Sequence, residues 1–364
     1  MLWVDELVKQ YPVPSREQGM RTGVDGVSFE VTAGELFTLL GPSGCGKTTT
    51  LRSIAGLERP DSGRIRLGDD VLFDGAARID RPANRRGLAM VFQSYAIWPH
   101  MSVWRNAAFP LEIAPRRIRL SRKQISERVA GALATVGLDG FADQGATRLS
   151  GGQQQRLALA RALVSEPSVL LLDEPLSNLD AKLRENMRLE LKRLQRDIGL
   201  TAIYVTHDQA EALSMSSRVA IMKAGKIAQI GKPRDIYGAP ADEFVADFLG
   251  VANFVSGVVS KPGEIQTDIG VFRATDRTPT AGQEVLVCLR PECLAVSMTR
   301  PATAAANEFE GKLVTAAFLG DRVDHVVTIS GVELRVRSHS AVRIRRDATV
   351  YVTINPADIV VLPR

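Results

Sequence analysis

A glycine-rich stretch near the N-terminus has the residue types that bind phosphate. Residues 41–48 read Gly-Pro-Ser-Gly-Cys-Gly-Lys-Thr, which matches the pattern G-x-x-x-x-G-K-[ST]. Glycines let backbone N–H groups turn toward phosphate oxygens, and a helix over residues 47–55, stopped by Gly56, would direct its positive end at the same anion. Lys47 would neutralise the β- and γ-phosphates, and the Thr48 hydroxyl would bind Mg²⁺. We therefore expect a nucleotide to contact Gly41, Pro42, Ser43, Gly44, Cys45, Gly46, Lys47, Thr48 and Thr49.

Two carboxylates follow a short apolar run in the middle of the chain. Residues 169–172 read Val-Leu-Leu-Leu, and Asp173 and Glu174 come directly after them. Such a run is typical of a buried parallel strand, and open α/β sheets bind ligands at the carboxyl ends of their strands. Asp173 is suited to the Mg²⁺ shell. Glu174 could polarise a water molecule facing the γ-phosphate.

A second glycine turn lies at residues 149–156, which read Leu-Ser-Gly-Gly-Gln-Gln-Gln-Arg. It opens a predicted helix that runs to about residue 165, before Pro167. Ser150 and Gln153 have the spacing of a capping box, which would make this an ordinary helix start. The same helix end could instead bind an anion. The residues of the turn alone leave both interpretations open.

Buried strands and covering helices must position these groups. Residues 36–40 and 202–205 are apolar runs like residues 169–172. Between the last two, Leu183, Met187, Leu191 and Leu194 recur at helical spacing. This alternation predicts an α/β fold.

The tail has a different character. After about Gly250, short β-type segments alternate with turns, and residues 285–291 align with residues 350–356. Upstream, residues 254–257, Phe-Val-Ser-Gly, align loosely with residues 309–311, Phe-Glu-Gly. We interpret the tail as two copies of a small β unit, packed as a compact barrel.

Composition narrows the class of protein. The 364 residues are 45% hydrophobic, which is enough for two domains with cores. No apolar run reaches the ~18 residues of a membrane-spanning helix, and the N-terminus does not read as a secretory signal. Three cysteines at irregular spacing fit a reducing cytoplasm, and a net charge of +5 does not by itself indicate nucleic acid.

The ordered set of motifs resembles the ATP-binding cassette (ABC) ATPases over about residues 3–240. Residues 41–48 match the Walker A loop, residues 169–174 the Walker B strand, and residues 149–153 the signature loop. Gln93 looks like the Q-loop glutamine, Asp180 lies in a sequence like the D-loop, His207 matches the switch histidine, and Tyr11 resembles the aromatic that stacks on adenine. The resemblance implies a P-loop NTPase cassette with ATP and Mg²⁺.

The resemblance also implies a mechanism. Two cassettes close head-to-tail around ATP, so that Ser150, Gly151, Gly152 and Gln153 of one copy, with Asp180, reach the nucleotide held by Lys47 of the other. Glu174 acts as the base, His207 positions the γ-phosphate, and Gln93 joins Thr48 and Asp173 at the metal and couples the site to a partner surface.

Three features depart from the family or add to it. Residues 12–23 form a longer stretch after Tyr11 than is usual, and Trp104-Arg105 precedes Asn106 where relatives commonly have an acidic residue. Cys45 lies inside the phosphate loop at a helix N-terminus, where a thiol pKa can fall. Cys45 is therefore either a small filler residue or an activated thiol through which thiol reagents would block ATP binding.

A cassette followed by a duplicated small barrel resembles the importer ATPases of the maltose, polyamine and ferric-iron type. We expect a cassette over residues 1–245, with a helical subdomain at about 94–165, and an all-β OB-like domain for regulation and dimer contact over residues 246–364. The resemblance implies a homodimer or paired cassette, two permease subunits, an extracytoplasmic solute-binding protein, and a peripheral location on the cytoplasmic face of the inner membrane. Residues 94–103 are rich in apolar and aromatic side chains, which would form a docking patch for a permease loop on the surface or a core segment beneath the helical subdomain.

The solute is less well indicated than the chemistry. Residues 318–321, Phe-Leu-Gly-Asp, resemble the polyamine and ferric-iron relatives, and this resemblance favours ferric iron or a polyamine, with sugars or other small solutes as the alternative. A soluble ABC ATPase acting on nucleic acid or the ribosome is a competing hypothesis, but there is a single phosphate loop and no sustained heptad pattern. We expect no nucleic-acid role. A nucleotide sensor without turnover is disfavoured because both Glu174 and His207 are present.

Overall fold

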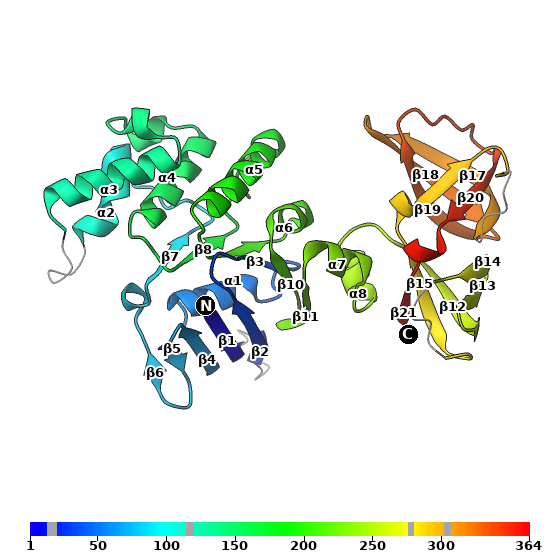
Figure 1. The fold of residues 1–364 in the computed structure, drawn as a ribbon, viewed down its shortest axis with the longest axis horizontal. Helices are drawn as coiled ribbons and strands as arrows, with labels where there is room; N and C mark the ends of the chain where they lie inside the picture. The colour runs from blue at the N-terminus through cyan, green and yellow to red at the C-terminus, as the bar shows by residue number, and fades with distance from the viewer. Residues whose placement is uncertain (13–19, 114–119, 276–279, 302–306) are drawn as a thin grey trace. The chain divides into compact units, whose positions relative to one another are not determined.

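The computed structural model describes residues 1–364 apart from 13–19, 114–119, 276–279 and 302–306. Its internal contacts separate two units, Met1–Pro233 and Arg234–Arg364, which are described in turn (Figure 1).

The centre of the first unit is a six-stranded sheet with the order β11-β10-β3-β9-β8-β7. All neighbouring strands in it are parallel except β10 and β11. The three apolar runs recognised in the sequence form β3, β8 and β9, and every residue of these strands is buried. The strands are β3 Leu36–Leu40, β7 Leu88–Val91, β8 Val169–Asp173, β9 Ala202–Thr206, β10 Arg218–Lys223 and β11 Lys226–Gly231.

A second, antiparallel sheet has the order β2-β1-β4-β5-β6. The helix α1 (Lys47–Ala55) shares an apolar core with both sheets and ends at Gly56, whose φ of 77° is left-handed, as expected from the sequence. The strands are β1 Leu2–Pro12, β2 Met20–Val31, β4 Ser62–Leu67, β5 Asp70–Asp74 and β6 Ile79–Asp80, and a 3₁₀ turn follows at Ala83–Arg85.

Helices α2 (Val103–Glu112), α3 (Arg122–Thr135) and α4 (Gly151–Leu163) pack together beside the six-stranded sheet. Helix α5 (Ala181–Asp197) uses the apolar face that the sequence predicted, and α6 (Gln209–Met215) follows β9. Short 3₁₀ turns lie at Asp139–Phe141 and Ala146–Arg148.

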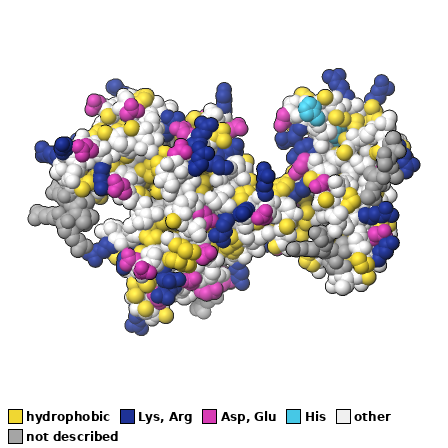
Figure 2. All heavy atoms as spheres, viewed as in Figure 1, with side chains coloured by type: hydrophobic (Ala, Val, Ile, Leu, Met, Phe, Trp, Pro, Cys, Tyr) yellow, Lys and Arg dark blue, Asp and Glu magenta, His cyan; other side chains and the backbone are white. Residues whose placement is uncertain are grey.

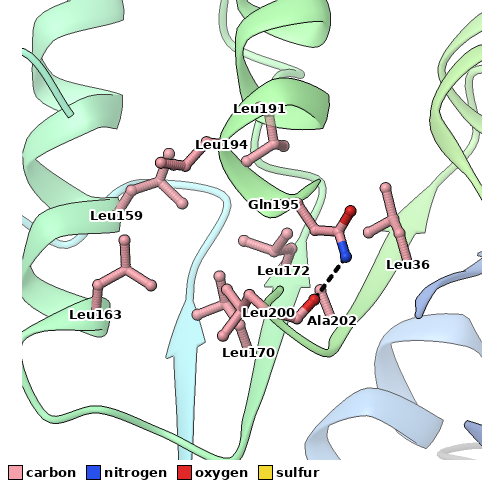
Figure 3. Close-up of a pocket in the computed structure, with 10 residues that line it drawn as sticks. All are labelled: Leu36, Leu159, Leu163, Leu170, Leu172, Leu191, Leu194, Gln195, Leu200 and Ala202. Atoms are coloured by element: carbon pink, nitrogen blue, oxygen red, sulfur yellow. Dashed lines mark hydrogen bonds between the residues drawn. The ribbon is translucent and has the colours of Figure 1, made fainter. Parts of the chain in front are cut away.

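The junction of α4, α5 and the sheet is a leucine-rich layer with one small gap (Figure 3). The gap measures about 10 Å³, and Leu159 and Leu163 of α4 face Leu191 and Leu194 of α5 across it. Gln195 is the polar side chain at its edge, and its amide donates to the Leu200 carbonyl at 2.6 Å. A space this small and apolar is a packing gap rather than a ligand site.

The second unit contains α7 (Pro233–Gly238), which begins at the boundary, α8 (Glu243–Phe248) and two five-stranded antiparallel sheets around one shared core. The sheet orders are β14-β13-β12-β15-β21 and β16-β20-β17-β18-β19. The strands are β12 Asn253–Lys261, β13 Glu264–Thr267, β14 Gly270–Arg273, β15 Glu284–Leu289, β16 Leu294–Ser297, β17 Glu308–Phe318, β18 Arg322–Ile329, β19 Val332–His339, β20 Thr349–Ile354 and β21 Val360–Pro363, with 3₁₀ turns at Pro291–Cys293 and Pro356–Asp358.

The predicted duplication is present in this topology. Each copy ends in a short strand, β16 or β21, that pairs in the sheet of the other copy. Gly257 lies opposite Val285 and Gly311 opposite Val350, so the two glycines are equivalent. At both, a Cβ would come within 3 Å of the neighbouring strand. The loose alignment of residues 254–257 with residues 309–311 holds at the glycines, and the register makes Val255, rather than Phe254, the counterpart of Phe309.

Two buried asparagines join the copies reciprocally. Asn253 of the first copy donates to the Arg335 carbonyl at 2.8 Å and accepts from the Arg335 N–H at 2.7 Å. Asn307 of the second copy donates to the Arg273 carbonyl at 2.9 Å and accepts from the Arg273 N–H at 2.6 Å. Each asparagine therefore satisfies both backbone groups of one residue in the other copy.

Candidate nucleotide-binding and hydrolysis site

The phosphate loop connects the end of β3 to the start of α1, as the sequence predicted. Two of its glycines are required by close backbone approaches. A Cβ on Gly41 would lie 2.5 Å from the Met222 carbonyl oxygen, and one on Gly46, whose φ is 104°, would lie 2.2 Å from the Gly23 carbonyl oxygen. Any larger residue at these positions would push the loop off its supporting strands.

The first two side chains of α1, Lys47 and Thr48, already have hydrogen-bond partners within the chain. The Lys47 ammonium is buried and donates to the carbonyls of Gly41 at 2.7 Å and Pro42 at 2.9 Å. The Thr48 hydroxyl donates to Asp173 Oδ1 at 3.1 Å. Because β9 lies between β3 and β8, the carboxyl ends of all three strands meet at one edge of the sheet and bring these groups together.

Thr48 and Asp173 form a donor set that fits Mg²⁺. A hydroxyl and a carboxylate oxygen within hydrogen-bond distance are the oxygen ligands that Mg²⁺ takes beside substrate phosphates. Burial raises the pKa of Asp173 above its ordinary value, and the Thr48 hydroxyl and the nearby Arg52 guanidinium offset part of this. A bound cation would offset the remaining cost of burying the charged Asp173 carboxylate.

Glu174 lies between the side chains of Gln93 and His207. Gln93 Nε2 donates to Glu174 Oε2 at 3.5 Å, and His207 Nδ1 lies 3.1 Å from Glu174 Oε1. The backbone of Glu174 is left-handed, with φ of 44°, and its N–H donates to the Val205 carbonyl at 3.0 Å. A non-glycine residue in this region costs on the order of 1–2 kcal/mol, so the turn after β8 holds the carboxylate in a conformation that the chain would not adopt by itself.

The signature residues form the start of α4. The capping box predicted for Ser150 and Gln153 is confirmed, with the Gln153 N–H donating to Ser150 Oγ and the Ser150 N–H to Gln153 Oε1. Gly151 and Gly152 lie beside the Leu179 and Leu183 side chains, next to the D-loop. Among the described residues, no hydrogen bond or ion pair joins this turn to the phosphate loop.

Asp180 is the N-cap of α5 and accepts from the Leu183 N–H at 3.0 Å. Its carboxylate therefore has a structural partner in its own chain. The proposed contact of Asp180 with nucleotide stays a prediction.

Tyr11 lies near the end of β1 and beside Thr49 of α1, and its stacking on adenine stays a prediction. Its hydroxyl donates to Glu58 and lies 3.1 Å from the Thr49 hydroxyl oxygen, and its ring packs over Gly23. The pKa of Tyr11 is raised by burial and by Glu58. Of the long stretch after Tyr11, residues 13–19 lie outside the described residues.

The expectation of a lowered pKa for the Cys45 thiol was wrong, whereas the alternative of a small filler residue agrees with its burial. Its side chain is 3% exposed and belongs to the apolar core behind the loop. Burial raises the pKa of Cys45, and the Lys47 ammonium offsets only part of the shift. The argument from the helix N-terminus failed because the thiol faces the core rather than the anion site.

Several supporting residues were missed by the sequence analysis. Asn178 donates to the Gln93 carbonyl at 2.7 Å and fixes the Q-loop from the D-loop side. Arg161, near the end of α4, donates to the carbonyls of Tyr95 and Ala96, both left-handed. These are long-range contacts between side chains and carbonyl groups, for which the local sequence carries no signal.

Comparison with known proteins decides the family. The ABC transporter family profile matches residues 24–177, and the TOBE domain profile matches residues 287–362. An Fe(3+) ions import ATP-binding protein of Rhizobium meliloti (strain 1021) is 47% identical over 316 residues, which are 86% of this chain and 85% of the relative. The chain belongs to the ATP-binding subunits of ABC importers.

Other relatives in this family carry different solutes in their names. A spermidine/putrescine import ATP-binding protein of Trichodesmium erythraeum (strain IMS101) is 44% identical over 88% of this chain and 85% of its own length. A trehalose/maltose import ATP-binding protein of Thermococcus litoralis is 47% identical over 77% of each chain. The predicted family is therefore confirmed, whereas the solute is not resolved.

The solved structures agree with the expected enzyme class. An ATP-binding cassette solved as a dimer bound to ADP and phosphate, in a post-hydrolysis state, covers 64% of this chain and 99% of its own, with 30% identity and a TM-score of 0.54. The predicted fold class, an ABC cassette with a C-terminal all-β OB-like domain, is confirmed. The subunit binds ATP and hydrolyses it to ADP and phosphate. Across the described residues, no helix combines the length and apolar character needed to cross a membrane.

Proposed function

We propose that this subunit powers the uptake of a small solute by hydrolysing Mg-ATP at a head-to-tail dimer interface. The observation that supports this chemistry is the position of Glu174 between Gln93 and His207. Glu174 directly follows Asp173, which accepts the Thr48 hydroxyl. Relatives named as importers match over both units of the chain and support the coupling to transport.

Glu174 accepts the proton of the attacking water, and His207 orients the γ-phosphate. The carboxylate is suited to this because its two neighbours hold it by both oxygens, which limits its rotation. Lys47 exchanges its two loop carbonyls for phosphate oxygens. Thr48 and Asp173, joined by Gln93, would hold Mg²⁺, which when bound neutralises charge on the β- and γ-phosphates.

A second copy of the subunit supplies the signature turn. Ser150 and Gly152 stand at a capped helix N-terminus that is suited to an anion and makes no described contact with the phosphate loop of its own chain. The signature turn would therefore contact a nucleotide held by the phosphate loop of a second copy, which favours a homodimer or a paired cassette.

A permease loop docks in the groove beside the Q-loop. The groove has a volume of about 330 Å³, and apolar side chains dominate its lining, among them Met90, Phe92, Trp98, Phe109 and Ile113. Ile113 is 65% exposed at its edge and extends the apolar lining of the groove to the surface. An apolar helix or loop of an integral-membrane permease fits this chemistry and would place the subunit peripherally on the cytoplasmic face of the inner membrane, with a solute-binding protein on the far side.

The favoured solute is ferric iron or a polyamine, with sugars or other small solutes as the alternative. Relatives named for iron and for spermidine/putrescine match over more of the chain than the trehalose/maltose relative, although identities are similar. Uptake of a sugar, and of neither iron nor spermidine, by the reconstituted transporter would refute this preference.

Purification from native membranes in mild detergent, followed by mass spectrometry, tests the transport role. We expect two polytopic permeases to co-purify, and their associated binding protein to indicate the solute. Recovery with ribosomes or nucleic acid instead would contradict transport. On the face shown in Figure 2, Lys and Arg are interspersed with Asp and Glu, which does not favour a nucleic-acid surface.

A further inference from the structure

The imidazole of His207 depends on its backbone for its position. Its side chain is 55% exposed, and its described polar contact is the one between Nδ1 and Glu174 Oε1 at 3.1 Å. An exposed ring is not fixed by packing, so the turn over residues 206–208 decides where it stands relative to Glu174.

A buried carboxylate four residues further on supports this turn. Glu211, in the first turn of α6, is 3% exposed. Its Oε2 accepts the Thr206 hydroxyl at 2.7 Å and the Tyr204 hydroxyl at 2.8 Å. Both donors come from β9, the strand that ends just before His207.

The Thr206 hydroxyl transmits this contact to the turn. It has a single proton, which it gives to Glu211, so its lone pairs remain directed at the backbone N–H of Asp208, 2.9 Å away. Glu211 thereby fixes the residues on both sides of His207. Asp208 Oδ1 in turn accepts the backbone N–H of Ala210 and of Glu211, which closes the turn onto α6.

The groups around Glu211 act on its pKa in opposite directions. Burial and the nearby Asp208 carboxylate raise the pKa of Glu211, and burial has the largest effect. The Thr206 and Tyr204 hydroxyls and the Arg184 guanidinium lower it. Arg184 itself lies 3.7 Å from Asp208 Oδ2. The carboxylate gives two buried hydroxyls an acceptor, and an apolar side chain at this position would leave both without one.

We propose that Glu211 is a positioning residue for ATP hydrolysis, which acts through the Thr206 hydroxyl to hold His207 against Glu174. The inference rests on the proposed function, in which His207 orients the γ-phosphate.

Matched variants of the full-length chain test it. Thr206→Val and Tyr204→Phe each remove one hydroxyl from Glu211, but only the Thr206 hydroxyl also holds the turn. We expect Thr206→Val and Glu211→Leu to lower kcat by about ten- to a hundredfold with KM for ATP within twofold of wild type. Thr206→Ser should restore kcat, and Tyr204→Phe should keep it even if its Tm falls.

A second readout does not depend on turnover. The chain has four histidines, so ¹³C-labelled histidine gives few NMR signals, and His207→Gln assigns the relevant one. Thr206→Val should shift the His207 signal and leave those of His325 and His339 in place.

The outcomes separate this inference from the proposed function. Equal loss of kcat in Tyr204→Phe and Thr206→Val, or an unmoved His207 signal in Thr206→Val, would overturn the positioning role. Loss in His207→Ala without loss in Thr206→Val and Glu211→Leu would overturn the positioning role alone. Full kcat in His207→Ala would overturn the role of His207 in the proposed function, and the positioning role of Glu211 with it.

Discussion

Asn307→Ala should destabilise the C-terminal unit by about 2–4 kcal/mol. The side chain is 1% exposed and makes three hydrogen bonds, two with Arg273 and one with the Ile354 carbonyl at 3.4 Å. Each contributes about 0.5–1.5 kcal/mol net, and the Arg273 backbone groups lose their partners. Asn253, with equivalent bonds in the other copy, is the matched second site, and Asn253→Ala should cost a similar amount.

Amide hydrogen exchange read by mass spectrometry measures the loss of stability within the C-terminal unit itself. All three tryptophans, Trp3, Trp98 and Trp104, lie in the first unit, so their fluorescence does not report on the β domain. Opening of β14 and β19 should become about 30- to 900-fold more frequent in either variant, the equivalent of 2–4 kcal/mol. Peptides from residues 1–233 should exchange as in wild type. Wild-type protection of β14 in Asn307→Ala would refute the reasoning, as would loss of protection confined to one copy.

Two further predictions concern a buried histidine and the relative reactivity of the three cysteines. Burial lowers the pKa of His325 below its ordinary value of 6.5, so its contribution to stability should be complete above pH 6.5 and lost as the pH falls through the lowered folded-state pKa. His325→Leu should flatten the acid side of the β-domain stability profile, whereas His339→Gln, at an exposed position, should not. Cys293, the least buried of the three cysteines, should react first with a thiol reagent, and modification at this stage should leave ATP affinity unchanged. Early labelling of Cys45 would contradict its burial.

The sequence was informative where one short segment carries the whole signal. The phosphate loop, the buried strand before Asp173 and the capping box at Ser150 each depend on residues within a few positions of one another, so pattern and structure agree. The duplication was also visible, because Gly257 and Gly311 must accommodate a neighbouring strand in both copies.

The sequence was uninformative where a side chain finds its partner far along the chain. Asn253 and Asn307 each bond a strand of the other copy, and nothing near them in the sequence marks this. Cys45 was misjudged because helix-end electrostatics can be inferred locally, whereas the apolar core that buries the thiol is assembled from distant strands. Glu211 reads as an ordinary residue of a helix until its two hydroxyl partners on β9 are seen.

Glu174→Gln tests the account most directly. The amide keeps the size of the carboxylate but cannot accept the proton of water, so kcat should fall by about 10²–10⁴-fold while ATP still binds and an ATP-dependent dimer accumulates in size-exclusion chromatography with light scattering. Glu166→Gln is the control, since Glu166 is also left-handed, with φ of 49°, but is exposed and paired with Arg128. We predict that the control turns over ATP like wild type. Unimpaired hydrolysis by Glu174→Gln would remove Glu174 from the role of base and contradict the central claim.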